Sequence, residues 1–307
     1  MPRRASAVLA LALVASACGG EPPPEPPRGL VASVASYDLA AGVGSRFMVG
    51  LLTEQNLFVS GGAVDLRFSF LGETGAEGEP RFYREAQAEF LPIPLEPEPP
   101  ARITVGPASQ GRGVYVVESF EFDRPGFWEV EVVAPLPGGT QRATAAFPVQ
   151  PEPLVPAVGE KAPRTQNLTV GSDAPPAAID SRAGVEGRIP DPELHRTTIA
   201  DAIADGRPVL AVFSTPVYCE SQFCGPITEM VSELERDYGD VAEFVHVEVW
   251  HDYEEGAINE AAADWLLTPD ENLTEPWVFL IGEDGRILAR WDNVATPQEI
   301  EPWLNRL

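Results

Sequence analysis

The chain has 307 residues, of which 44% are hydrophobic, and it carries a formal net charge of −26 at pH 7. This hydrophobic content is typical of globular domains and excludes a largely disordered chain, and the length predicts two domains behind an N-terminal targeting segment. The acidic balance argues against nucleic-acid binding, which needs a basic face, and against purely electrostatic attachment to anionic lipid.

The N-terminal residues predict export and membrane anchoring. Residues 1–17 combine a basic start with an apolar run too short to span a bilayer. Small residues precede Cys18, a pattern that resembles a bacterial lipoprotein signal cleaved before a lipid-bearing cysteine. We therefore predict a protein lipid-anchored to a bacterial cell membrane on its extracytoplasmic face, with an ordinary secretory signal as the alternative. The proline-rich residues 18–28 predict a stiff tether.

Residues 29–150 predict an all-β domain. Apolar and polar residues alternate through several runs, as in strands with one buried face, and turn residues separate the runs. Seven such strands predict a β-sandwich that resembles immunoglobulin-like domains in general. No catalytic constellation is visible in it, so a spacer or partner-binding role is expected. The predicted strands are 30–37, 46–52, 63–71, 81–90, 113–122, 127–134 and 141–149.

After a proline-punctuated linker at 151–167, residues 168–307 alternate helical and strand patterns. A βαβ unit followed by a hairpin and a helix predicts a mixed sheet with helices on both faces. Thr296 and Glu299 form a capping box at the start of the last helix. The predicted helices are 198–204, 226–238, 257–267 and 297–306, and the predicted strands are 208–213, 243–250, 277–281 and 286–291.

Cys219 and Cys224 lie between strand 208–213 and helix 226–238, and apart from Cys18 they are the only cysteines. Pro226 is favoured at a first helical position, so Cys224 is predicted just outside the helix. A helix N-terminus favours a thiolate and lowers the pKa of a cysteine beside it. Loop cysteines with this spacing can form a disulfide, which persists in an oxidising compartment. A plain structural disulfide is the alternative.

The order of elements, the cysteine loop after a central strand, and the run from Thr274 to Leu280 resemble the thioredoxin-like superfamily over residues 168–307. The resemblance implies a cis proline, Pro276, lying against the cysteines, with Glu275 and Trp277 flanking a substrate groove. Two features depart from thioredoxins. Four residues separate these cysteines instead of two, and strand 208–213 lacks the buried carboxylate of that family.

Other branches of the superfamily imply different chemistry. The segment from Thr215 to Cys224 also resembles peroxiredoxins, which implies Cys219 as the peroxidatic and Cys224 as the resolving cysteine, although the arginine of that family is absent. Copper-delivery proteins of the Sco type combine a cysteine pair with a distant histidine. His246, however, alternates with valines and is predicted to be a sheet residue, His251 follows that strand, and His195 shows no role.

The sequence therefore predicts a membrane-anchored thiol–disulfide oxidoreductase without metal or cofactor, acting on extracytoplasmic protein thiols and disulfides. Cys224, nearer the helix, is predicted to attack and Cys219 to resolve, and the reverse assignment stays open. A peroxiredoxin-like thiol peroxidase, a non-enzymatic binding module with a structural disulfide, and a copper-handling protein are the alternatives.

Overall fold

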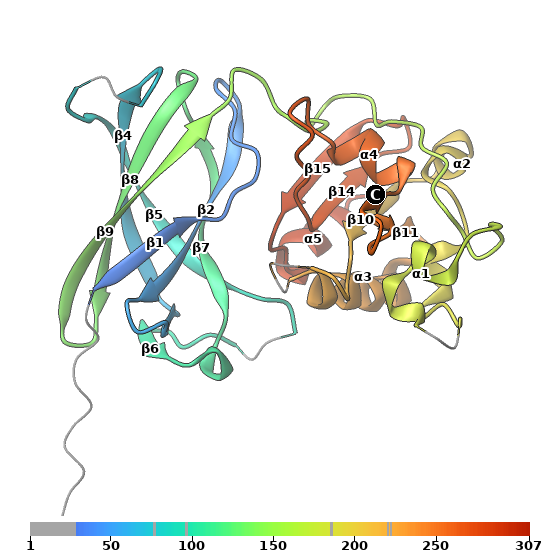
Figure 1. Ribbon diagram of the computed structural model, residues 1–307, viewed down its shortest axis with the longest axis horizontal. Coiled ribbons are helices and arrows are strands. Elements are labelled where there is room, and N and C mark those ends of the chain that lie inside the picture. Colours follow the sequence, from blue (N-terminus) through green and yellow to red (C-terminus); the bar gives the residue numbers. More distant parts are fainter. Residues whose placement is uncertain (1–28, 76–77, 96–97, 185–186, 220, 222) are drawn as a thin grey trace, which may run out of the picture.

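The computed structural model describes residues 29–307 except 76–77, 96–97, 185–186, 220 and 222. The predicted signal peptide, the lipidation site at Cys18 and the tether at 18–28 lie outside the described residues. Within the described part of the chain, none of the helices is both long and apolar enough to cross a membrane. Strands dominate the secondary structure and form two main sheets, one in each half of the chain (Figure 1).

The first half is all-β, as predicted. Its strands form one nine-stranded sheet in the order β6-β3-β2-β7-β5-β4-β8-β9, with β1 paired to the C-terminal half of β2. All seven predicted strands are present, and β3 and β6, of three residues each, were missed. The strands are β1 (Leu30–Val34), β2 (Gly44–Thr53), β3 (Phe58–Ser60), β4 (Ala63–Gly72), β5 (Arg81–Pro92), β6 (Thr104–Gly106), β7 (Gly113–Glu121), β8 (Gly126–Leu136) and β9 (Gly139–Val149).

This sheet curls over a single aromatic core. β1 also runs beside β9, so strands from opposite ends of the sheet face each other (Figure 1). The Phe47 ring on β2 lies 4.8 Å from the Phe68 ring on β4 and 5.2 Å from the Phe147 ring on β9. Trp128 is fully buried beside them. The alternating patterns therefore place one face of each strand in a shared core, as a sandwich requires.

The second half is built on a four-stranded mixed sheet in the order β11-β10-β14-β15. Its central strand β10 pairs parallel with β11 and antiparallel with β14, and β14 pairs antiparallel with β15. The predicted mixed sheet is present, and the structure adds its strand order. The strands are β10 (Val209–Ser214), β11 (Glu243–Glu248), β14 (Trp277–Ile281) and β15 (Ile287–Asp292).

Helices cover both faces of this sheet, as predicted. Apolar residues of α3 (Cys224–Tyr238) and α5 (Pro297–Leu304) pack on one face in a cluster with Leu210 and Val212. Residues of α2 (Ile199–Ala204) and α4 (Glu260–Leu266) pack on the other face with Ala211 and Phe213. Because successive β10 residues point to opposite faces, its continuous apolar run is buried on both. The capping box of α5 is also present.

The structure corrects several predictions for the second half. Helix 257–267 begins only at Glu260, because Ala257 and Ile258 form β13, which pairs with β12 (Trp250–Asp252). The predicted linker 151–167 is packed: Val155 and Ala162 are buried in the core of the second half, and the backbone bonds to Ile287 on β15. Three short helices precede α2 and were missed: α1 (Pro176–Ile179), η2 (Ser181–Ala183) and η3 (Pro192–His195).

The two halves are joined by a buried polar interface. Arg46 on β2 donates to the carbonyl of Val294 at 2.9 Å and forms ion pairs with Glu299 at 2.8 Å and Asp292 at 3.4 Å. An apolar cluster lies beside these contacts. The first half is thus packed against β15 and the start of α5. Further contacts join Arg290 to Asp38 and Asn293 to the carbonyl of Ala35.

Candidate functional site

Cys219 and Cys224 form a disulfide, with their Cα atoms 6.0 Å apart. The two sulfurs have different surroundings. Cys219 lies in the loop and is partly exposed, whereas Cys224 is fully buried. Cys224 is the first residue of α3, so the helix starts two residues earlier than Pro226 predicted. The earlier start is allowed because first-turn amides need no partner within the helix, so a proline there breaks no bond.

The segment that precedes β14 lies against the disulfide, as the resemblance implied. The Glu275–Pro276 peptide is cis. A carboxylate oxygen of Glu275 and the sulfurs of Cys219 and Cys224 all lie within 4.8 Å of one another, and the Oε2 atom of Glu275 is shielded from solvent. Because the sulfurs are bonded to each other, this group offers no thiolate to a metal ion while the disulfide is closed.

Trp277 is almost fully buried, and the pocket that it helps to line lies beside Arg46 and Arg290 and does not include the cysteines. Its side chain is 1% exposed and its indole N–H donates to Thr274 at 3.1 Å. The ring stacks near Phe279 on the same strand and contributes to the core shared with α4. The prediction for this residue was wrong because Trp277 is the first residue of β14 and its side chain points into the sheet's packed face.

The first half of the chain contributes Tyr37 to the wall of the site. Its hydroxyl donates to the backbone carbonyl of Glu275 at 2.7 Å, and its amide donates to Asp292 at 2.7 Å. Burial, reinforced by the nearby carboxylates, raises the pKa of Tyr37 far above its ordinary value, so it remains a neutral phenol. The sequence held no signal for this role, because Tyr37 stood only at the end of a predicted strand.

An exposed aromatic surface borders the cysteine loop. Val217 is 55% exposed and Tyr253 is 46% exposed. The rings of Tyr218 and Tyr253 stack with centroids 4.1 Å apart, and Trp250 meets Tyr253 edge-on at 5.5 Å. Exposed apolar residues that adjoin one another often mark an interaction surface. Here they lie directly before the partly exposed Cys219 and on the neighbouring β12 loop.

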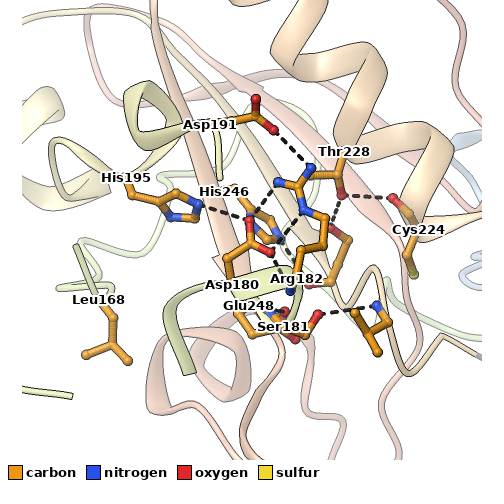
Figure 2. Close-up of polar contacts among 12 residues, drawn as sticks. Leu168, Asp180, Ser181, Arg182, Asp191, His195, Cys224, Thr228, His246 and Glu248 are labelled. Carbon is orange, nitrogen blue, oxygen red and sulfur yellow. Dashed lines mark hydrogen bonds and ion pairs between the residues drawn. The ribbon is translucent and has the colours of Figure 1, made fainter. Parts of the chain in front are cut away.

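Behind the loop lies a buried network that the sequence did not reveal (Figure 2). Asp180 is fully buried, and its two carboxylate oxygens accept hydrogen bonds from the Arg182 guanidinium at 2.6 and 3.0 Å. His195 Nε2 lies 3.4 Å from the same carboxylate and His246 Nδ1 lies 3.5 Å from it. Both histidines are fully buried, whereas His251 is exposed and stands apart.

Burial alone would raise the pKa of the Asp180 carboxyl, but the contacts from His195, His246 and Arg182 hold that pKa well below its usual range. Burial lowers the pKa of His195 despite the neighbouring carboxylate. At neutral pH the network is therefore an Asp180–Arg182 ion pair with a neutral His195. Arg182 also pairs with a second carboxylate, that of Asp191, at 2.9 Å.

Asp180, His195 and His246 offer one carboxylate oxygen and two ring nitrogens within 4.8 Å of one another. Two histidines and a carboxylate are a donor set that several transition metals accept. Arg182, however, already occupies both carboxylate oxygens, and its positive charge would repel a cation at the same point. The arrangement fits a structural charge network better than a metal centre.

Hydrogen bonds connect this network to the cysteine loop. His246 Nε2 lies 3.1 Å from the carbonyl of Ser214, whose hydroxyl is 2.6 Å from that of Thr228. The Thr228 hydroxyl donates to the carbonyl of Cys224 at 2.8 Å, as Figure 2 shows. These contacts connect β11, the end of β10 and the first turn of α3. The position of Cys224 thus depends on residues that lie far away in the sequence.

A buried acid is present beneath the loop, although it comes from β11 and not from the strand before the cysteines. Glu248 on β11 is paired in register with Ser214, the last residue of β10. It is 2% exposed and accepts the amide of Ser181, whose hydroxyl accepts the amide of Val217 in the loop. Burial raises the pKa of Glu248, outweighing the hydrogen bonds and His246, which lower it.

Comparison with known proteins adds no family. No protein-family model matches the chain, and no curated protein matches it. The chain is similar to the solution structure of the PKD domain from the human VPS10 domain-containing receptor SorCS2. That match has 16% sequence identity and a TM-score of 0.21, and covers 49% of this chain and 98% of the other. At this TM-score nothing about fold or function rests on the likeness.

Proposed function

We propose that this protein is a thiol–disulfide oxidoreductase, with an immunoglobulin-like sandwich and a thioredoxin-like second domain. The observation that carries the proposal is the asymmetry of the Cys219–Cys224 disulfide. One sulfur is reachable, and the other is buried at the first residue of a helix. The mixed sheet with helices on both faces, and the segment before β14 that brings the Glu275 carboxylate beside both sulfurs, support the thioredoxin-like assignment.

The exposures favour Cys219 as the reacting sulfur, the reverse of the order predicted from helix proximity. A substrate thiolate attacks Cys219 Sγ, the Cys219–Cys224 bond breaks, and Cys224 leaves as a thiolate. The helix N-terminus stabilises that charge and makes Cys224 a good leaving group. A second substrate thiolate then attacks the mixed disulfide and releases Cys219. The reverse sequence reduces a substrate disulfide and closes the pair.

A polypeptide partner is supported by the surface beside Cys219. Val217 and the stacked pair Tyr218 and Tyr253 present an aromatic border that can accept apolar side chains flanking a substrate cysteine. The proposed location, lipid-anchored through Cys18 on the extracytoplasmic face of a bacterial membrane, is supported by the sequence pattern before that cysteine. Such an oxidising compartment also preserves disulfides.

Two single-cysteine variants test the proposal and the assignment together. Reduced Cys224→Ser retains the exposed thiol and is expected to form a mixed disulfide with oxidised glutathione, detected by intact-protein mass spectrometry. Reduced Cys219→Ser retains only the buried thiol and is expected to react far more slowly. If Cys219→Ser is trapped faster, the assignment of the two cysteines is wrong.

Equilibration of the wild-type pair with glutathione buffers tests the function itself. An exchange catalyst is expected between about −120 and −270 mV, whereas a structural disulfide lies below about −300 mV. A reduction potential below about −300 mV would favour the alternative of a binding module with a structural disulfide. The peroxidase alternative is weakened because a carboxylate, Glu275, lies beside the sulfurs where activation would call for a cation. The copper alternative needs a histidine beside the cysteines. The ring nitrogens of His246 instead lie near Asp180 and the carbonyl of Ser214.

A further inference from the structure

The position of Glu275 bears directly on the chemistry of the two sulfurs. Its carboxylate lies within 4.8 Å of both Cys219 Sγ and Cys224 Sγ, and its Oε2 atom is shielded from water. A separation of this size allows a proton to pass between the carboxylate and either sulfur through one water molecule. The backbone of Glu275 is held by the Tyr37 hydroxyl on one side, and the buried Pro276 follows on the other.

A carboxylate at this point has two opposite effects. As a fixed negative charge it raises the pKa of a nearby thiol and so reduces the fraction of reactive thiolate. As a base it accepts the thiol proton while sulfur attacks, which speeds the reaction below the thiol pKa. The N-terminus of α3 already favours a thiolate at Cys224, whereas Cys219 lies in the loop outside the helix. Ser221 Oγ lies 3.2 Å from Cys219 Sγ. A hydroxyl is a far weaker base than a carboxylate, so Glu275 is the neighbour better able to hold the thiol proton.

We propose that Glu275 is the acid–base catalyst of the disulfide exchange, an inference that rests on the function proposed above. In the reducing direction, the Cys219 thiol passes its proton to the Glu275 carboxylate as Cys219 Sγ attacks a substrate disulfide. A Cys219–substrate bond forms, the substrate S–S bond breaks, and the first substrate sulfur leaves as a thiolate that takes a proton from water. Glu275 then releases its proton to water.

The second half of the cycle uses the same carboxylate. Cys224 Sγ attacks Cys219 Sγ and transfers its proton to Glu275, the mixed disulfide breaks, and the second substrate thiolate leaves with that proton. The substrate has then gained two electrons and two protons, and the cysteine pair has lost them. In the oxidising direction the steps run backwards, and the Glu275 carboxylic acid protonates the departing Cys224 thiolate.

The test measures the rate at which the reduced protein reduces the disulfide of oxidised glutathione, from pH 5 to 9. It compares wild type with Glu275→Gln. Glu275→Gln keeps the size of the side chain but accepts no proton. At pH 7 it is expected to react at least about tenfold more slowly, the low end of the effect of general acid–base groups. Above the pKa of the Cys219 thiol no base is needed, so the two rates are expected to converge. Glu283→Gln, which removes an exposed carboxylate in the β14–β15 turn, is the matched control.

The opposite sign identifies a purely electrostatic role. If Glu275 only repels the thiolate, then Glu275→Gln reacts faster than wild type at pH 7, and an equal or higher rate overturns the proposal. Glu275→Asp retains a shorter carboxylate and is expected to recover part of the rate with the wild-type pH dependence, which covers the case of a misfolded glutamine variant. If wild type opens no disulfide at all, the proposed function fails together with this inference, whereas an active wild type matched by Glu275→Gln refutes only the role of Glu275.

Discussion

Replacing Arg46 by methionine tests whether the two halves of the chain depend on each other for stability. Arg46 is 11% exposed in its side chain and contacts Asp292 and Glu299, which are 8% and 15% exposed. It also donates to the carbonyl of Val294. Removing one partner from a buried ion pair leaves an uncompensated charge and costs about 3–5 kcal/mol. We therefore expect Arg46→Met to lower the free energy of unfolding by about that amount at pH 7.

The loss is expected to depend on pH. Burial raises the pKa of Asp292, and Arg46 opposes that shift, so Arg46→Met raises this pKa further. The folded state then binds the Asp292 proton more tightly than the unfolded state does. The penalty is consequently largest above the raised pKa and shrinks as pH falls through it, because a protonated Asp292 no longer needs a cation.

Urea unfolding at pH 7 and at pH 5, followed by tryptophan fluorescence, measures both effects. Arg142→Met is the control, because Arg142 pairs with Glu131 across a 3.0 Å contact but is 54% exposed in its side chain. An exposed pair of this kind contributes about 0–1 kcal/mol. A loss for Arg46→Met no larger than that of the control, or one that does not shrink at pH 5, refutes the reasoning.

Three further outcomes follow from the site. Asp180→Asn is expected to destabilise the protein by about 3–5 kcal/mol, measured by urea unfolding, since it leaves the Arg182 cation without its buried partner; a loss below about 1 kcal/mol contradicts the network. Glu248→Gln is expected to flatten the thermal stability profile above pH 4.5, because the raised pKa of Glu248 makes wild type lose stability as pH rises toward that pKa; parallel profiles contradict the burial argument. Tyr253→Ala is expected to raise KM for a cysteine peptide with aromatic neighbours while the rate with oxidised glutathione is unchanged; equal losses with both substrates contradict a docking role.

Local sequence patterns were sufficient to predict the longer strands and helices, because each of these elements carries its own periodic pattern. Alternation in residues 63–71 predicts β4 because a strand shows successive side chains to opposite faces. Helical spacing predicts the body of α3, and the Thr296 and Glu299 pair predicts the start of α5. The short strands β3 and β6 escaped prediction because three residues are too few for a period to be visible.

The disulfide partners and the position of Pro276 could also be foreseen, the former from the short loop and the latter from a family resemblance. The sequence alone therefore determined most of the longer strands and helices, and which two sulfurs pair. Only the tertiary structure decided which sulfur is reachable, since exposure depends on everything packed around the loop. It also brought Tyr37 to Glu275, and Asp180 to two histidines, by joining segments whose separation along the chain no local period can record.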